Sequence, residues 1–233
     1  MNLSQYKTDG FTVLRDIFTP AWDENFMQKR LLDWQRLPKD EYRLAARMFA
    51  KGASQMSLFL MPKVREAMAQ LGVRDPVFMT EPAIHVMGVD KAWDGVGAHQ
   101  DYPSLQSSLN GVVIWMPYTR VGLDNYPIEF APGSHLRGLL PAKAGAHYSE
   151  VDDAGMGFVP IPVSVGSAIL FSVFTVHRTR TPGTGMRLAL SMRYEDSADP
   201  WFQSGRYYST HRRSIDREVK CAPTVEQVRE ALA

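Results

Sequence analysis

The sequence predicts a mainly β protein whose β core is covered by a helical amino-terminal layer. After Pro76, short runs rich in Val, Ile, Phe and other aromatic residues alternate with Gly, Pro, Asp and Asn turns, which is typical of an all-β sandwich or barrel. Before Pro76, apolar residues recur at helical spacing. No repeat or Pro/Gly/Ser-rich linker divides the 233 residues. We therefore expect a single domain over 1–233, with a helical layer mostly over 1–75, a β core over about 76–195 and a carboxy-terminal extension over 196–233.

The helical layer is expected to begin with a short helix over residues 3–8, with Ser4 as its cap. Thr19 as N-cap and Pro20 in the first turn predict the start of a second helix, and the spacing of the apolar residues that follow extends it to about Gln35. Further helices are predicted over Tyr42–Ala50, from Pro62 to Leu71 with an end at Gly72, and over Thr224–Leu232 with Thr224 as N-cap.

The predicted strands share β-branched and aromatic residues bounded by turn formers. They are Phe11–Leu14, Val77–Met79, Ala83–Met87, Gly111–Met116, Ile128–Ala131, Phe158–Pro160, Ser167–Phe171 and Leu188–Tyr194. Side chains alternate between the two faces of a strand. We therefore expect Val113 and Trp115 to point into the core together.

Composition and charge exclude several functional classes. The chain is 45% hydrophobic and 22% charged, as in ordinary globular proteins, and its net charge of +1 gives no electrostatic case for nucleic-acid binding. The single cysteine, Cys221, excludes an intramolecular disulfide and a Cys-based zinc or iron–sulfur site. The amino terminus lacks the pattern of a signal peptide, and the longest apolar runs are too short to span a bilayer. We expect a cytoplasmic protein with no membrane partner.

Three side chains have the types and spacing of a metal site. His99 and Asp101 are two residues apart, so in an extended segment they lie on one face and can meet the same ion. His177 follows the apolar run Ala168–Val176, so it is expected at a strand end, where a barrel can bring it to the same mouth. Two imidazoles and one carboxylate leave coordination positions open, the arrangement of non-haem Fe(II) oxygenases. His-x-Asp alone is common in surface loops, so the later histidine is needed for this interpretation.

Arg187 is the fourth candidate. It lies in the apolar segment Met186–Leu190, where an arginine is costly to bury without a partner. A planar guanidinium binds a carboxylate through two hydrogen bonds, so Arg187 is suited to the far end of a dicarboxylate that chelates iron. The alternative is an arginine paired with a structural Asp or Glu.

Several segments, taken in order, carry a family resemblance. They are Tyr6–Leu14, Leu71-Gly72, His99-Gln100-Asp101, the strand Val112–Met116, the Pro132-Gly133-Ser134-His135 segment, His177 and Arg187. Together they span roughly residues 5–195 and resemble the phytanoyl-CoA dioxygenase-like branch of the Fe(II)/2-oxoglutarate oxygenases.

The resemblance implies a double-stranded β-helix, a cupin-like jelly-roll barrel, with iron in its mouth. It implies His99, Asp101 and His177 as catalytic iron ligands, 2-oxoglutarate and O2 as cosubstrates, and Arg187 as the anchor of the distal carboxylate of 2-oxoglutarate. The expected reaction is hydroxylation of an unactivated C–H bond of a small molecule, with release of succinate and CO2. Because Asp101 is retained, halogenation is not expected. His135 is expected to satisfy local backbone groups and not to bind metal.

Further residues are secondary candidates for the site. His85 is expected to touch 2-oxoglutarate or substrate, and Thr179 to hydrogen-bond the cosubstrate; the alternatives are a core histidine and a structural threonine. Trp115 and Tyr102 are candidates for the substrate pocket, with core packing and a rim position as their alternatives. Tyr126 replaces a glycine that the family usually has before its Pro-Gly-Ser-His strand. That turn therefore has a different backbone, or the tyrosine side chain is directed to a useful place.

A different functional class fits the same barrel. A cupin-like metal-dependent isomerase, or a non-catalytic small-molecule binding module, would use the His-Asp-His set without 2-oxoglutarate. Such a protein would not need Arg187, which is the discriminating residue. Hydroxylation, desaturation, ring closure and epimerisation share the same ligands, so the sequence does not distinguish among them, nor does it give the oligomeric state.

Overall fold

The computed structural model describes residues 1–20, 22–78, 82–89, 95–105, 108–145, 149–202 and 223–233. Cys221 and part of the carboxy-terminal extension lie outside these residues. The helices are α1 Leu3–Asp9, α2 Glu24–Gln35, α3 Lys39–Ala50, α4 Ala53–Leu58, α5 Pro62–Gln70, α6 Tyr102–Leu105 and α7 Val225–Leu232, with a 3-10 turn η1 at Ser134–Arg137. The strands are β1 Phe11–Leu14, β2 Pro76–Phe78, β3 Ala83–Met87, β4 Val112–Pro117, β5 Ile128–Phe130, β6 Ala142–Ala144, β7 Ser149–Val151, β8 Val159–Ile161, β9 Ala168–Ser172, β10 His177–Thr179 and β11 Arg187–Asp196.

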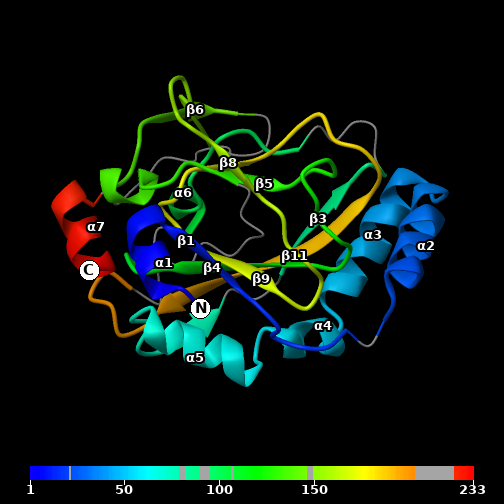
Figure 1. Cartoon of the computed structure of the whole chain (residues 1–233), viewed down its shortest axis with the longest axis horizontal. Helices are drawn as coiled ribbons and strands as arrows, with labels where there is room; N and C mark the ends of the chain where they lie inside the picture. Colours follow the sequence, from blue (N-terminus) through cyan, green and yellow to red (C-terminus); the bar gives the residue numbers. More distant parts are fainter. Residues whose placement is uncertain (21, 79–81, 90–94, 106–107, 146–148, 203–222) are drawn as a thin grey trace.

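The described part of the chain is layered, with helices on one face of a larger sheet and a smaller sheet on the other. The larger sheet has the order β1-β9-β4-β11-β2, with β3 also pairing with β11, and the smaller sheet has the order β10-β5-β8. Strands β6 and β7 pair separately as a two-stranded sheet. In Figure 1, α4 and α5 lie below the larger sheet, whereas β5 and β8 lie above it. The predicted β core with a helical amino-terminal layer is confirmed. Among the described residues no ladder joins the two sheets, so they face each other as separate sheets and do not close into a barrel.

Two apolar clusters fill the spaces on either side of the larger sheet. Val112 and Ile114 of β4 belong to the cluster between the larger sheet and the helices, whereas Val113 and Trp115 belong to the cluster between the two sheets. The expected common face of Val113 and Trp115 is thereby confirmed. Burying each such side chain stabilises the fold by roughly 1.5–3 kcal/mol relative to leaving it exposed, so β4 is held from both sides.

The predicted start of the second helix is wrong. The helix begins at Glu24, and the side chain of Asp23, not that of Thr19, accepts the capping hydrogen bond, from the Phe26 amide at 2.6 Å. The segment before this helix packs against the end of β4 instead, because Trp22 stacks on Tyr118 with ring centroids 4.9 Å apart. Tertiary packing has overridden the local helix-start signal.

Other helix predictions are closer to the structure. The first helix is capped by the side chain of Asn2, which accepts from the Gln5 amide at 3.0 Å, and not by Ser4. The carboxy-terminal helix is confirmed, with Thr224 and Gln227 forming a capping box. The short helix α4 was not predicted. No helix in the described ranges is long and apolar enough to cross a membrane.

The strand predictions are confirmed to within about two residues at each end, with Met79 outside the described residues. His177 was expected to end a strand formed by the apolar run Ala168–Val176, but β9 ends at Ser172 and His177 is the first residue of β10. Both chain ends lie on the same side of the molecule in Figure 1, where the Lys7 ammonium donates to the Ala233 carbonyl oxygen.

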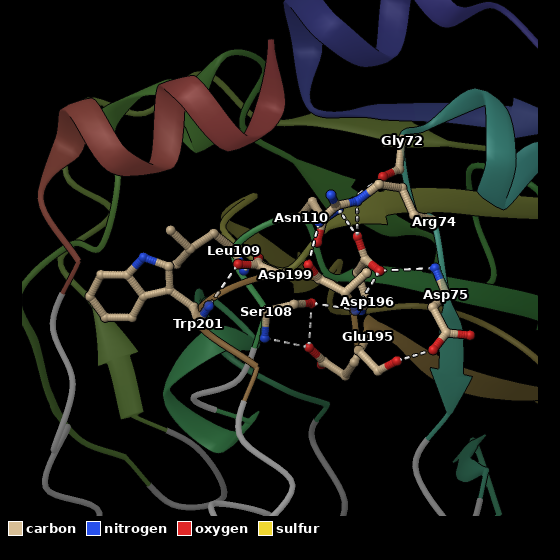
Figure 2. Close-up of polar contacts among 12 residues, drawn as sticks. Gly72, Arg74, Asp75, Ser108, Leu109, Asn110, Glu195, Asp196, Asp199 and Trp201 are labelled. Carbon is tan, nitrogen blue, oxygen red and sulfur yellow. Dashed lines mark hydrogen bonds and ion pairs between the residues drawn. The ribbon is translucent and has the colours of Figure 1, made fainter.

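A group of acidic side chains closes the far end of β11. We call Glu195, Asp196 and Asp199 the β11 carboxylate cluster (Figure 2). Asp196 accepts hydrogen bonds from the Asp75 amide at 2.9 Å and from the Asn110 side chain at 3.0 Å. The other donors to the cluster are the Ser108 amide and hydroxyl at 2.9 and 2.8 Å, the Leu109 amide at 2.6 Å, the Trp201 amide at 2.8 Å, the Ala198 amide at 3.1 Å and the Arg74 guanidinium at 3.3 Å. These bonds fasten the loop before β4 to the end of β11.

Candidate metal centre

The two histidines and the aspartate singled out from the sequence lie together between the sheets. His99, Asp101 and His177 each offer a ligand atom, and these atoms all lie within 4.8 Å of one another. All three residues are buried, with exposed fractions of 4%, 1% and 7%. Elsewhere in the described ranges, no other group of three or more His, Cys, Asp or Glu side chains is arranged to hold a metal ion.

Backbone pairing brings these distant residues together. His99 and His177 face each other in an isolated antiparallel bridge, with both N···O distances at 3.0 Å. Gln100 points to the opposite side and is buried, and its amide group donates to the carbonyl oxygens of Gly138 and Phe174 at 2.8 and 2.6 Å. This alternation fixes the segment so that the residues on either side of Gln100 face the same point.

The hydrogen bonds of both rings are made by Nδ1, which puts the lone pair on Nε2. His99 Nδ1 lies 2.8 Å from the Gly97 carbonyl oxygen, and His177 Nδ1 lies 3.0 Å from the Thr175 carbonyl oxygen. A carbonyl oxygen only accepts, so each Nδ1 carries the proton and each Nε2 carries a lone pair. A backbone partner of this kind is the usual companion of a metal-binding histidine.

Burial and neighbouring charges set the protonation states that metal binding requires. Burial lowers the pKa of His99 to about 3 and also lowers that of His177, so both rings are neutral at pH 7. Burial by itself would raise the pKa of Asp101, but the Arg193 guanidinium and the two imidazoles hold it well below its usual range. The donor set is therefore two neutral nitrogens and one carboxylate, which suits a divalent transition metal.

The three residues open onto a small cavity. Its apolar wall contains Val113, Trp115, Ile128 and Phe171, and its polar wall contains His85, Arg178, Thr179, Arg187, Ser191 and Arg193. Ser191 and Arg193 were not singled out from the sequence. Their signal is the alternation along β11, which places them on the same face as Arg187.

Arg187 is buried at the cavity and is incompletely hydrogen-bonded. One terminal nitrogen donates to the Tyr126 carbonyl oxygen, and the guanidinium lies 5.2 Å from the ring centroid of Trp115. Burial lowers the pKa of Arg187 to about 9, which still leaves it charged at pH 7. It forms no ion pair with the described carboxylates, unlike a structural arginine. Within the described part of the chain, its Nε and the Trp115 indole N–H are buried donors without an acceptor.

Tyr126 explains part of the position of Arg187. Its φ is 61°, so the tyrosine adopts the left-handed conformation that a glycine usually supplies. The backbone of this turn is therefore of the kind a glycine allows, despite the larger residue. Its carbonyl oxygen accepts from Arg187, and its ring packs against Gly183, where a Cβ atom would come within 2.6 Å of the ring.

The secondary candidates divide between the cavity and the core. His85 lines the cavity, and its Nε2 lies 2.9 Å from the Ser191 hydroxyl oxygen. Thr179 lines the cavity, and its amide donates to the Val96 carbonyl oxygen at 2.9 Å. Trp115 contributes to the wall. Tyr102 is not among the lining residues, and its ring stacks on Phe174 in the core, with centroids 4.5 Å apart.

His135 lies outside the centre. Its Nε2 is 3.1 Å from the Lys7 carbonyl oxygen, so it meets a backbone group, as expected from the sequence. The neighbouring Ser134 hydroxyl accepts from the Val176 amide at 2.9 Å, directly before His177. Gly133 takes a positive φ of 74° at the turn. This segment therefore supports the strand end that carries His177.

The residues present fit iron and a dicarboxylate. The Nε2 lone pairs and the carboxylate are the donor set of a non-haem iron centre with open positions. An acidic ligand in the cavity would satisfy the Arg187 and Trp115 donors that have no acceptor among the described residues, and a buried donor without an acceptor is costly. Fe(II) and 2-oxoglutarate, with O2, thus match the site on the chemistry of its own side chains.

Comparison with known proteins agrees with this geometry. The chain is 29% identical over 160 residues to the methylphosphonate hydroxylase of Gimesia maris, and the match covers 65% of this chain and 61% of that protein. The chain therefore spans less than two thirds of the length of this relative.

Solved structures show the same fold. The non-haem monooxygenase ThoJ, without metal, superposes with a TM-score of 0.63 at 21% identity, covering 84% of this chain and 77% of that one. The non-haem α-ketoglutarate-dependent epimerase SnoN from nogalamycin biosynthesis gives a TM-score of 0.61 at 18% identity, covering 95% and 92%. EctD from S. alaskensis, solved with 2-oxoglutarate and 5-hydroxyectoine, gives 0.60 at 17% identity, covering 86% and 78%.

The sequence profile of one family matches residues 6–188, which contain His99, Asp101, His177 and Arg187. This match covers well over half of the chain. The chain belongs to the phytanoyl-CoA dioxygenase (PhyH) family, a branch of the non-haem Fe(II)/2-oxoglutarate-dependent oxygenases.

Proposed function

We propose that the protein is an Fe(II)- and 2-oxoglutarate-dependent dioxygenase that hydroxylates an unactivated C–H bond of a small molecule and releases succinate and CO2. The single observation that carries the proposal is the convergence of His99, Asp101 and His177 on one cavity that also holds the buried, incompletely bonded Arg187. Family membership supports the reaction class.

In this proposal each residue has a defined task. His99 Nε2, His177 Nε2 and an Asp101 oxygen hold the iron, which supplies activation of dioxygen when bound. Arg187 binds the distal carboxylate of 2-oxoglutarate through charge-assisted hydrogen bonds, assisted by the Trp115 N–H. Thr179 and His85 line the same cavity and orient the cosubstrate.

The protein also keeps the site dry and the substrate close to the metal. Val113, Ile128 and Phe171 form an apolar wall beside the cluster, which favours exclusion of water from the reacting groups. His85 adds no charge to the cavity at pH 7, because burial lowers its pKa to about 3. Holding the substrate close to the metal in this way lowers the entropic part of the reaction barrier.

The substrate is expected to be small, because it must share this cavity with 2-oxoglutarate. The relative from Gimesia maris is named for methylphosphonate, so small alkylphosphonates are the first compounds to screen. A panel that also contains amino acids and sugars tests whether the preference extends beyond phosphonates. The readout is succinate formation that increases when the compound is added.

The proposal is tested by adding Fe(II) and then 2-oxoglutarate to the protein without oxygen. We expect a weak visible charge-transfer band that requires both additions, and succinate formation once air is admitted. His177→Ala should lose both signals. His135→Gln is the matched control, because it changes a buried histidine outside the centre, and it should retain both. If the band is absent while the metal binds, the isomerase or binding-module alternative is favoured.

A further inference from the structure

Arg193 lies against the metal-binding aspartate. It is on β11, on the same face as Arg187, and one of its terminal nitrogens donates to Asp101 Oδ1 at 2.9 Å. Its side chain is 13% exposed and that of Asp101 is 1% exposed, so the pair is shielded from water. Shielded pairs are weakened less by salt than surface pairs, and charge-assisted hydrogen bonds are short and directional.

The two oxygens of Asp101 therefore have different neighbours. Oδ1 is occupied by Arg193, whereas Oδ2 lies 3.9 Å from His177 Nε2. Two metal ligands sharing one ion are expected at such a separation, so Oδ2 is the oxygen that faces the metal position. A carboxylate with one oxygen already hydrogen-bonded is held in one orientation, and it is biased against offering both oxygens to the metal.

We propose that Arg193 is a positioning residue that holds Asp101 in one-oxygen coordination and so preserves the open positions that the cosubstrate and dioxygen need. This inference rests on the proposed iron site. A carboxylate that bound through both oxygens would take one more position and compete with the chelating end of 2-oxoglutarate. Arg193 does not touch the reacting atoms in this role and acts through Asp101.

Two physical effects of removing Arg193 have opposite signs. The guanidinium is a cation close to the metal position, so its charge alone opposes the binding of a divalent ion. Its hydrogen bond fixes the ligand geometry, and loss of such a partner typically weakens metal binding about 10–100-fold. The positioning role requires the second effect to dominate, so the direction of the change is itself diagnostic.

The experiment compares Arg193→Met, Arg193→Lys and wild type in the full chain. Fe(II) dissociation constants are measured without oxygen, and the charge-transfer band is recorded after 2-oxoglutarate is added. We expect Arg193→Met to bind Fe(II) about 10–100-fold more weakly and to shift the band. Arg193→Lys restores the charge and one donor, so it should fall between Arg193→Met and wild type. Thermal unfolding of each metal-free variant verifies that it is folded.

Arg178→Met is the matched control. It removes another arginine from the same cavity wall, but Arg178 donates to Glu129 and Asp153 at 2.8 and 2.7 Å and not to Asp101. Its Fe(II) affinity should stay within about twofold of wild type. The proposal is overturned if Arg193→Met binds Fe(II) as tightly as wild type, or more tightly, with an unshifted band. If wild type itself fails to bind Fe(II), the proposed function and this inference both fail.

Discussion

The two ends of strand β11 carry polar groups that are equally buried but differently satisfied. At the cavity end, Arg187 has a donor without an acceptor in the described structure. At the other end, the β11 carboxylate cluster is surrounded by donors from the backbone and from neighbouring side chains, as Figure 2 shows for Asp196 and Asp199. The same strand therefore holds one region whose carboxylates accept hydrogen bonds from the protein and one whose buried Arg187 has a donor without an acceptor among the described residues.

This difference separates structural from functional polar residues more clearly than burial does. Asp101 and Asp196 have buried side chains, with exposed fractions of 1% and 0%. In both, burial alone would raise the pKa, and neighbouring groups lower it. Hydrogen bonds from Asn110 and the backbone lower the pKa of Asp196. The pKa of Asp101 is lowered instead by a guanidinium and two imidazoles that share its cavity. Only the second set leaves donor atoms for a metal.

The largest effect is expected from Asp101→Ala. This change removes one of three proposed metal ligands. Loss of a residue that only contacts a ligand typically weakens metal binding by up to about 100-fold, so Fe(II) affinity should fall by more than that here. Succinate formation should be lost with it. Anaerobic Fe(II) titration and a succinate assay measure the two effects. Undiminished succinate formation in this variant would remove Asp101 from the metal centre.

The next effect is expected from Arg187→Gln. Hydrogen bonds between charged groups contribute about 1.5–3 kcal/mol each, so the KM for 2-oxoglutarate should rise by roughly 10–100-fold. Fe(II) affinity should be nearly unchanged, because Arg187 contacts the Tyr126 carbonyl and the Trp115 ring, not a proposed ligand. Steady-state kinetics against 2-oxoglutarate and an iron titration distinguish the two. An unaltered cosubstrate requirement would mean that the carboxylate binds elsewhere.

Asp196→Ala should show the reverse pattern. The change removes the acceptor of the Asp75 backbone N–H and one of the two acceptors of the Asn110 side-chain amide, so the free energy of unfolding should fall by about 2–4 kcal/mol. Fe(II) affinity of the folded protein should remain that of wild type. Urea unfolding and iron titration of the same preparation provide the test. Loss of iron binding without loss of stability would show that the two ends of β11 are not independent.

The smallest effect near neutral pH concerns the buried histidines. Burial lowers the pKa of both His85 and His99 to about 3, so between pH 6.5 and 3 the unfolded chain binds protons that the folded chain does not. Stability of the metal-free protein should therefore fall as pH is lowered through this window, by at most about 1.4 kcal/mol per pH unit for each histidine. His85→Gln should flatten the slope of unfolding free energy against pH. An identical slope would mean that His85 is protonated in the folded state.

Local patterns predicted much of the fold. Strand positions followed from alternating β-branched residues and turn formers, and the Thr224 cap followed from its own short segment. The start of the second helix could not be predicted in this way, because the stacking of Trp22 on Tyr118 joins segments far apart in the sequence. The separation of the β core into two sheets likewise depends on long-range pairing.

The site was predictable to the extent that its residues have unusual local settings. His99 and Asp101 stand out by their spacing of two residues, Arg187 as a charged residue in an apolar segment, and His177 as the residue that follows an apolar run. Arg193 carries only the weaker signal that it shares a face of β11 with Arg187, and its role is not evident until its contact with Asp101 is seen. The hydrogen bond from Arg187 to the Tyr126 carbonyl oxygen could not be predicted either, since a positive φ at tyrosine cannot be deduced from residue type.

The most direct test of the account is the spectrum of the oxygen-free protein with Fe(II) and 2-oxoglutarate, compared between wild type and Arg187→Gln at limiting cosubstrate. We expect a visible band in wild type that needs both components, and in the variant the same band only at much higher 2-oxoglutarate. A protein that binds Fe(II) yet develops no band at any 2-oxoglutarate concentration would contradict the account.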